Sequence, residues 1–208
     1  GLAIADKLRT QVTSINQGIS NGNSAIALLQ IADKSMAEQS KILDTVKAKL
    51  IQANTDTTSA DGRTAIAKDV SKLLEQLNNI AKQTNYNGTN LLQAAATSTA
   101  TKTALSFQIG ENPSDMIETA AIQANTLGYG LDTLSAAAGT GASAAAGASV
   151  FTRAQATAGQ TAVDTAITKL NGYRGDIGST QNQVESAVRN LMTQATNIKN
   201  AESVIRDV

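Results

Sequence analysis

The sequence predicts a mainly α protein, an elongated antiparallel helical bundle or coiled-coil rod with a small β-hairpin at one end. Apolar residues recur at every seventh position near the C-terminus, from Val163 to Ile205, without a polar interruption. A similar column runs from Leu8 to Leu50, with Gly22 as its one gap. Because heptad spacing keeps one stripe of a helix facing a partner helix, we expect the two ends of the chain to pair.

The composition argues against several classes of function. The 17 basic and 17 acidic side chains are balanced and scattered, so we expect neither nucleic acid nor a membrane as a partner. The chain has no Cys and no His, which removes thiolate catalysis, imidazole catalysis and the usual zinc sites. No apolar stretch approaches the ~20 residues needed to cross a bilayer. We predict that the chain is not an enzyme and binds no cofactor.

The first helix is predicted over roughly 1–53. A second apolar column accompanies the first through Val12 and Ile19 and turns polar at Asp33. We interpret this change as one helix that exchanges partners along its length. The alternative is two helices separated near Gly18–Gly22, because each glycine costs about 1 kcal/mol of helix propensity relative to alanine.

A second helix follows the polar residues 54–59, which offer several N-caps. Its apolar positions alternate in spacing between four and three residues and include Leu73 and Leu77. Asn87-Gly88 ends the segment, because these residues tolerate a positive φ. The first two helices therefore form an antiparallel helical hairpin.

The middle of the chain, 93–134, is predicted as a β-hairpin and loop region. LSFQIG at 105–110 alternates apolar and polar residues, a turn with the only proline follows, and MIETAAIQ returns as a second strand. NTLGYGLDTLS then forms a loop or short helix. Residues 135–149 are almost entirely Ala, Gly, Ser and Thr, too little apolar bulk for a core of their own. The last helix is expected to begin at 150–152 and to continue to the end of the chain.

We therefore predict a single domain over 1–208, in which the halves 1–92 and 150–208 pack together. The seam between the helices is predicted to contain Leu8, Val12, Ile15, Ile19, Leu29, Leu43, Leu50, Leu73, Leu77, Ile177, Val184, Leu191 and Ile198.

Several segments, in the same order along the chain, resemble bacterial flagellin. GLAIADKLRTQVTSINQGISNGNSAIALLQIAD resembles the N-terminal signature of that family, and KLLEQLNNIAKQTNYNGTNLL resembles the end of its second helix. FQIGEN resembles the start of its β-hairpin, and LNGYRGDIGSTQNQVESAVRNL resembles its C-terminal coiled-coil helix. The resemblance covers most of the chain outside 93–104 and 135–149. Its pattern is closest to Campylobacter- and Helicobacter-type flagellins.

This resemblance implies the inner rod domain of a structural subunit of the flagellar filament, which is secreted and self-assembles head to tail for motility. The implied partners are other flagellin subunits, an export chaperone and a cap protein. Residues 135–149 would stand in place of the family's outer domains. The family's terminal polymerisation segments would precede Gly1 and follow Val208, so we expect a truncated core that forms filaments poorly.

Two other functions stay open. A flagellar hook–filament junction protein shares the terminal helices, but it would be expected to diverge from FQIGEN and NTLGYGLDTL. A signalling coiled-coil rod would explain the heptads, but it leaves the β-hairpin and the Ala/Gly/Ser tract unexplained.

The resemblance also implies poor binding to the Toll-like receptor that senses many flagellins. The family's receptor-binding pattern in the late first helix resembles QRxRELAVQ, whereas this chain reads DTVKAKLIQ from Asp44 to Gln52. Thr45 stands in place of Arg and Lys49 in place of Leu, and Gln76 of the second helix stands in place of Glu. Loss of one buried anchor commonly costs about 2 kcal/mol or more at an interface, so we expect this altered epitope to evade the receptor.

Gly172, Gly175 and Gly178 lie three residues apart in the last predicted helix, where they sacrifice roughly 3 kcal/mol of helix propensity in total. We interpret them as a face of close helix packing. The alternative is a locally weak helix that its surroundings tolerate.

Two short motifs have competing interpretations. Arg174-Gly175-Asp176 spells an integrin-binding tripeptide, but its place in a heptad helix favours a packing role. Asn87-Gly88-Thr89 matches the N-glycosylation pattern, but a helix-ending turn explains Asn-Gly equally well.

Overall fold

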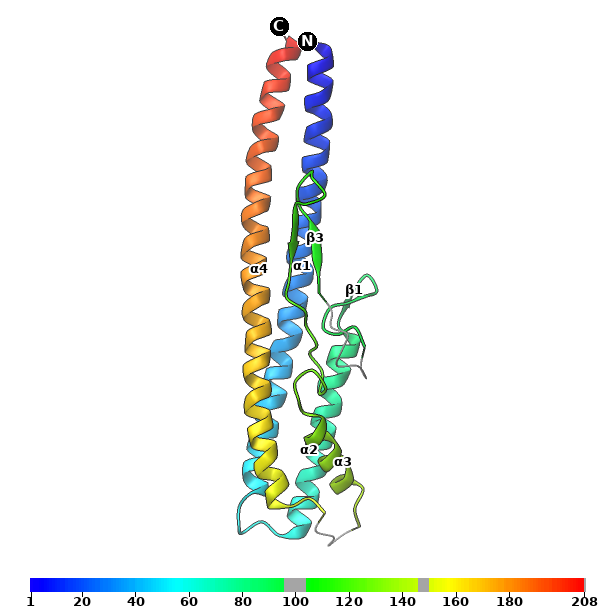
Figure 1. Cartoon of the computed structure of the whole chain (residues 1–208), viewed down its shortest axis with the longest axis vertical. Helices are drawn as coiled ribbons and strands as arrows, with labels where there is room; N and C mark the ends of the chain where they lie inside the picture. The colour runs from blue at the N-terminus through cyan, green and yellow to red at the C-terminus, as the bar shows by residue number, and fades with distance from the viewer. Residues whose placement is uncertain (96–103, 146–149, 208) are drawn as a thin grey trace. The chain divides into compact units, whose positions relative to one another are not determined.

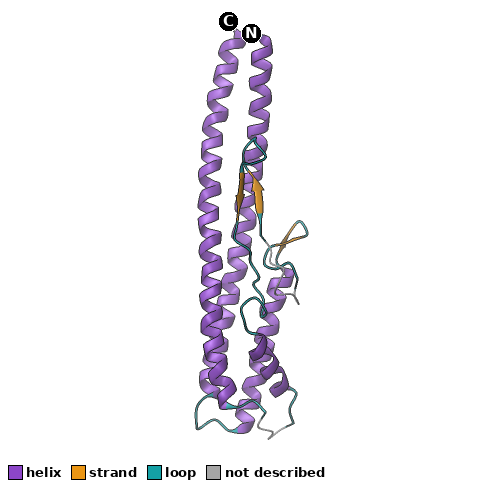
Figure 2. Cartoon of the chain, viewed as in Figure 1, coloured by secondary structure: helices purple, strands orange, loops and turns teal. Residues whose placement is uncertain are grey.

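The computed structural model describes residues 1–95, 104–145 and 150–207, and most of them are helical (Figure 2). The elements in chain order (Figure 1) are α1 (Leu2–Ala53), α2 (Ala60–Gln83), β1 (Asn85–Tyr86), β2 (Thr89–Asn90), β3 (Ser106–Gln108), β4 (Met116–Glu118), α3 (Asp132–Ala142) and α4 (Arg153–Asp207). The predicted mainly α class is confirmed, and so is the hairpin of β3 and β4. The predicted bounds of the three main helices are also confirmed.

The chain divides into two compact units, and both long helices contribute to each. Unit 1 contains Gly1–Ile31, Ala104–Ala120 and Asp176–Val208, and unit 2 contains Ala32–Thr103 and Ala121–Gly175. The prediction of a single domain over 1–208 stays a prediction.

In unit 1, α1 and α4 run antiparallel (Figure 1). They approach closely at two glycines of α1. A Cβ atom added to Gly22 would lie 2.3 Å from Val188 Cγ2, and one added to Gly18 would lie 3.1 Å from Leu191 Cδ1. A side chain at position 22 would overlap Val188, whereas at position 18 the main obstacle is the carbonyl oxygen of Ile109, 2.2 Å from the added Cβ atom. Because α1 is continuous through both positions, the alternative of two helices separated near Gly18–Gly22 is wrong.

The β3–β4 hairpin of unit 1 lies beside α1 (Figure 1). Its strands are antiparallel and pair Phe107 with Ile117. The side chain of Asn21 on α1 donates a hydrogen bond from Nδ2 to the carbonyl oxygen of Gln108, at 2.8 Å. The hairpin is thus tied to the helix face that contains the two glycines of α1.

In unit 2, α2 begins and ends where the sequence predicts. Ser59 is the N-cap, and its Oγ accepts a hydrogen bond of 3.0 Å from the backbone N–H of Gly62. The helix ends at Gln83, and Asn87 and Gly88 have φ of 50° and 81°. These two residues turn the chain between β1 and β2, a second hairpin that the sequence analysis did not predict.

The buried face of α2 differs by one residue from the predicted seam. Leu74 is 1 % exposed, whereas Leu73 is only half-buried. Val70, Leu74 and Leu77 are spaced by four and then three residues, which keeps them on one helical stripe. The assignment of Leu73 to the seam is therefore corrected to Leu74.

A helix, α3, begins inside NTLGYGLDTLS, which was predicted as a loop or short helix, and it extends into the Ala/Gly/Ser tract, which the sequence analysis did not predict. Residues up to 142 belong to α3, and a Cβ atom added to Gly141 would lie 2.8 Å from Ala67 Cβ and 2.9 Å from Phe151 Cβ. Small residues therefore pack α3 against α2 instead of merely filling a linker. Residues 146–149 of the tract, and 96–103 of the region predicted as hairpin and loop, lie outside the described residues.

Leu74→Ala is expected to lower the free energy of unfolding by about 2–5 kcal/mol, because it leaves a cavity beneath a fully buried side chain. Leu73→Ala is the matched control on the same helical turn, and we expect it to cost less than half as much. Urea unfolding followed by circular dichroism measures both. A larger loss at Leu73 would contradict this register.

Candidate functional site

The candidate functional feature of this chain is a seam between helices. Of the predicted seam residues, the buried ones are Ile15, Leu29, Leu43, Leu50, Leu77, Ile177 and Val184. The half-buried ones are Leu8, Val12, Ile19, Leu73, Leu191 and Ile198. The seam residues belong to α1 and α4 in unit 1, and to α1 and α2 in unit 2.

One seam position of α1 is polar, and the sequence analysis did not identify it. Gln39 has no exposed surface. The second apolar column of the sequence analysis passes through Asp33 and Ser40. Position 39 is not part of that column, so the sequence analysis did not identify it as buried. Heptad counting from a buried alanine would have found it, because five buried residues recur at every seventh position: Ala25, Ala32, Gln39, Val46 and Ala53.

The buried amide of Gln39 makes three hydrogen bonds within unit 2, which involve both its nitrogen and its oxygen. Its Nε2 donates to the carbonyl oxygens of Ala124, at 2.7 Å, and Leu77, at 3.2 Å. Its Oε1 accepts a hydrogen bond of 2.8 Å from the hydroxyl of Tyr129. A buried amide without partners would cost about 1–3 kcal/mol, so these contacts fix where the segment around Tyr129 lies against α1 and α2.

Burial raises the pKa of Tyr129 well above its ordinary value, and the nearby Tyr173 raises it further. The two rings have centroids 6.0 Å apart. The phenol therefore stays protonated and continues to donate to Gln39 at any neutral pH. Because the folded pKa is the higher one, this contribution to stability is lost only as the pH rises above about 10.

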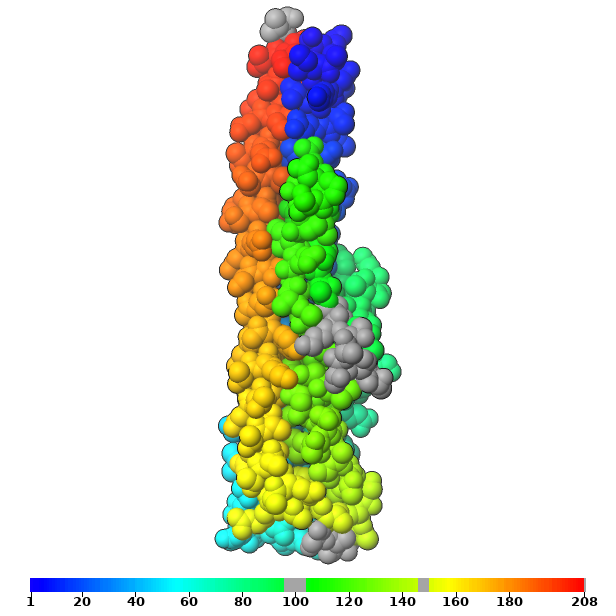
Figure 3. All heavy atoms as spheres, in the orientation of Figure 1, coloured from blue at the N-terminus to red at the C-terminus, as the bar shows by residue number. Residues whose placement is uncertain are grey.

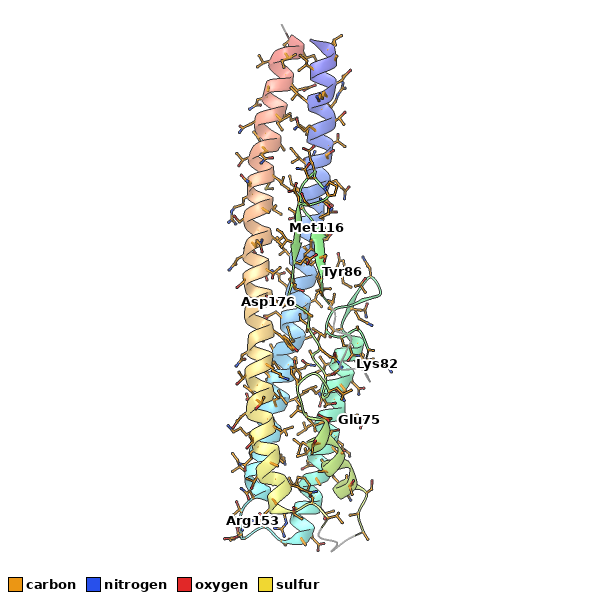
Figure 4. The ribbon with its side chains drawn as sticks, viewed as in Figure 1. Glu75, Lys82, Tyr86, Met116, Arg153 and Asp176 are labelled. Atoms are coloured by element: carbon orange, nitrogen blue, oxygen red, sulfur yellow. The ribbon has the colours of Figure 1, made fainter. Side chains whose placement is uncertain are left out.

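The Arg174-Gly175-Asp176 motif lies inside α4, which confirms the helical placement predicted for it. In unit 2, Arg174 Nε donates to Asp33 Oδ1 at 2.9 Å, and this hydrogen bond raises the pKa of the guanidinium. In unit 1, Asp176 Oδ2 accepts from the backbone N–H of Ala120 at 2.8 Å (Figure 4). Both charged side chains are thus engaged within the chain, unlike those of a free integrin-binding loop.

The residues of the predicted altered receptor epitope lie mostly on the surface. Asp44, Thr45 and Gln76 are exposed, and Lys49 is half-buried. Lys49 Nζ lies 3.1 Å from Asp69 Oδ2 on α2, so this lysine links the two helices by an ion pair. The structure does not test receptor binding, which stays a prediction.

The predicted close packing at Gly172, Gly175 and Gly178 is wrong within this chain. A Cβ atom added to any of the three would meet no other atom within 4 Å. Close approach occurs instead on α1, at Gly18 and Gly22. Glycine spacing cannot distinguish these cases, because the closeness depends on where the partner lies.

A groove of about 510 Å³ opens in unit 1 beside the turn of the β3–β4 hairpin. Ile15 and Leu191 contribute apolar surface, and Asn190 and Gln194 of α4 contribute amide groups. Figure 3 shows the hairpin in green between the blue and red helices. Glu111 and Asp115 of the hairpin turn also line the groove, which therefore combines apolar surface, amide groups of α4 and carboxylates.

Within residues 1–95, 104–145 and 150–207, no three Asp or Glu side chains are grouped as metal ligands would be. None of the helices described is long and apolar enough to cross a membrane. The candidate functional features within the described residues are therefore helix faces, ion pairs and two short hairpins.

Gly18→Ala and Gly172→Ala form a matched pair with opposite expected outcomes. Alanine gains about 1 kcal/mol of helix propensity at either position. At Gly18, however, its Cβ would lie 2.2 Å from the carbonyl oxygen of Ile109, a backbone atom that cannot rotate away. We expect Gly18→Ala to lower the free energy of unfolding and Gly172→Ala to raise it, measured by urea denaturation. A stabilising Gly18→Ala would rule out this close contact.

Comparison with known proteins links these helices to one family. The bacterial flagellin N-terminal helical region matches residues 1–97, and the bacterial flagellin C-terminal helical region matches residues 160–208. The two matches together cover α1, α2 and most of α4.

Curated relatives agree with this result. Flagellin B of Helicobacter pylori is 42 % identical over an alignment of 123 residues, which covers 56 % of this chain and 24 % of the relative. The chain thus spans about a quarter of the length of that relative. A flagellar filament 30.7 kDa core protein of Treponema maltophilum is 29 % identical over 210 residues, covering 100 % of this chain and 71 % of the relative.

Solved structures show the same architecture. Bacillus cereus flagellin matches with a TM-score of 0.66 and 27 % identity, over 88 % of this chain and 94 % of that one. A putative flagellar hook-associated protein from Vibrio parahaemolyticus matches with a TM-score of 0.77 over 96 % of this chain and 94 % of that one. Its identity of 12 % supports a shared fold alone. The two family regions and the Helicobacter relatives show that this chain belongs to the bacterial flagellin family and is of the Helicobacter type.

Proposed function

We propose that the chain is part of a structural subunit of the bacterial flagellar filament. The observation that carries this proposal is the similarity to the Treponema maltophilum filament core protein over the whole chain, hairpin included. The two flagellin family regions fall on the helices whose antiparallel packing builds both units. In a filament subunit, these packed helices would form the structural core.

Assembly would follow from contacts that do not close on themselves. When one patch of a subunit binds a different patch of the next, repetition gives a helical fibre. We propose that the chain acts in this structural way and not as an enzyme. The lack of Cys and His supports that view, because the side chains that most often act as nucleophile and base in hydrolases are missing.

The partners proposed for this protein are those of a secreted filament subunit. They comprise further flagellin subunits, an export chaperone and a cap protein, and the site of action is the extracellular flagellum. Family membership supports each of them. The polar exposed residues Thr45 and Gln76 also support weak binding to the flagellin-sensing Toll-like receptor, because a hot-spot interface uses large anchors.

The alternative of a hook–filament junction protein has one observation in its favour, the fold shared with the Vibrio parahaemolyticus protein. At 12 % identity that likeness carries no function. The hairpin and the sequence match to a filament core protein favour the filament subunit over both the junction protein and a signalling coiled coil.

A cysteine placed in the full gene product distinguishes these functions. Ser143 is exposed and the chain has no other cysteine, so Ser143→Cys can be labelled selectively with a maleimide dye on living cells. A filament subunit predicts label along the whole external filament. Label confined to a short band near the cell would indicate a junction protein, and absence of external label would contradict both. The same protein with Ser143 unchanged is the control, because it shows any labelling that does not depend on the new cysteine.

Receptor evasion is tested by restoring the anchors that the family pattern contains. Thr45→Arg, Lys49→Leu and Gln76→Glu together should raise signalling, since about 2 kcal/mol per anchor corresponds to roughly 30-fold in affinity. Reporter cells exposed to nanomolar protein measure the effect. Lys82→Leu, which makes the same lysine-to-leucine change at an exposed position of α2 (Figure 4), is the control. Strong signalling by the unaltered protein would contradict the proposal.

A further inference from the structure

The dipeptide Asn-Gly occurs at three places in this chain: Asn21-Gly22, Asn87-Gly88 and Asn171-Gly172. We infer that Asn87 is a site of spontaneous covalent modification, at which the side chain closes to a succinimide and then opens to aspartate or isoaspartate. The other two dipeptides are protected by the helices that contain them. The folded structure thus makes one of three identical dipeptides reactive.

The reaction needs no reagent other than water. The backbone nitrogen of Gly88, after losing its proton to solvent, attacks Cγ of Asn87. A new N–Cγ bond closes a five-membered ring, the Cγ–Nδ2 bond breaks, and ammonia leaves. Water then adds to either ring carbonyl and gives aspartate or isoaspartate. Glycine as the second residue favours ring closure because no Cβ crowds the attacking nitrogen.

The structure leaves Asn87 free to reach this geometry. Asn87 and Gly88 are both exposed, and a Cβ atom added to Gly88 would meet nothing within 4 Å. The strands β1 and β2 that flank the turn have two residues each, so opening the turn breaks little structure. The Gly88 N–H donates to Asn85 Oδ1 at 3.4 Å, which is longer than a normal hydrogen bond.

Asn21 is held by its surroundings in α1. Its Nδ2 donates to the carbonyl oxygen of Gln108 at 2.8 Å, and Gly22 is buried against Val188. Ring closure there would require both the helix and the hairpin contact to open.

Asn171 provides an internal control, because it matches Asn87 in exposure. Asn171 and Gly172 are exposed on α4, and the space around Gly172 is as open as that around Gly88. The difference lies in the backbone, since Gly172 is in the interior of a 55-residue helix. Its N–H is bonded to the carbonyl four residues earlier, and the nitrogen can attack only after that helix opens locally.

Modification would change the small hairpin in two ways. It adds a negative charge to an exposed turn, next to the exposed strand β2 and the half-buried Tyr86 (Figure 4). Isoaspartate also inserts one extra carbon into the main chain between two paired strands. The pairing of Asn85 with Asn90 and of Tyr86 with Thr89 would then lose its register.

Ageing the full chain at neutral and mildly alkaline pH, followed by peptide mapping with mass spectrometry, tests this inference. In the folded chain we expect Asn87 to convert at least about tenfold faster than Asn171, a difference of about 1.4 kcal/mol in barrier. In urea-unfolded chain, all three sites should convert at similar rates. Equal rates at Asn87 and Asn171 in the folded chain would overturn the inference, as would an unchanged Asn87 over the time in which unfolded chain converts.

Two variants localise the chemistry. Asn87→Gln should abolish the fast conversion, because its longer side chain would need a six-membered ring, and Asn171→Gln should leave it unchanged. Fast conversion that persists in Asn87→Gln would place the reaction elsewhere and overturn the inference.

Discussion

The antiparallel seam between α1 and α4 is the interaction on which the other features of each unit depend. In unit 1 it presents the glycine face of α1 that the β3–β4 hairpin contacts, and in unit 2 it is flanked by the ion pair of Lys47 with Asp164, at 2.6 Å. Surface ion pairs contribute about 0–1 kcal/mol each, whereas full burial of one leucine or isoleucine contributes about 1.5–3 kcal/mol. Apolar burial therefore supplies most of the stability, and the ion pairs and hydrogen bonds select the register.

Small and polar residues decide how closely each neighbour approaches this seam. Gly18 and Gly22 admit the hairpin and α4, and Gly141 admits α3 to α2. Whereas the glycines permit a close approach, Gln39 fixes the position of its neighbours, since its buried amide can be hydrogen-bonded only when Tyr129 and Ala124 occupy their observed places. Glycines without such neighbours, at 172, 175 and 178, have no packing role within the chain and leave one face of α4 open.

The fold could be predicted from sequence wherever a pattern is local. Heptad columns located both long helices, the polar residues 54–59 located the start of α2, and alternation in LSFQIG located β3. The errors concern properties that depend on a distant partner. Leu73 and Leu74 are identical residues, and they differ only in which one packs against the rest of unit 2. The glycines of α1 and those of α4 likewise differ only in whether another segment packs against them. The heptad that contains Val46 would have indicated the position of Gln39, but the partners that satisfy its buried amide could not be predicted from sequence, because they lie far along the chain. The β1–β2 hairpin was missed because two-residue strands have no periodicity.

A spin-label series on unit 2 tests the antiparallel register most directly. One nitroxide replaces Lys47 on α1, and the second replaces Thr157, Asp164 or Asn171 on α4, which are all exposed or half-buried positions. Neighbouring positions in this series differ by seven residues, or about 10 Å along the helix. Pulsed electron paramagnetic resonance should give the shortest distance for the pair with Asp164 and longer, comparable distances for the other two. A shortest distance to Thr157 or Asn171, or no short distance at all, would contradict the seam and the account built on it.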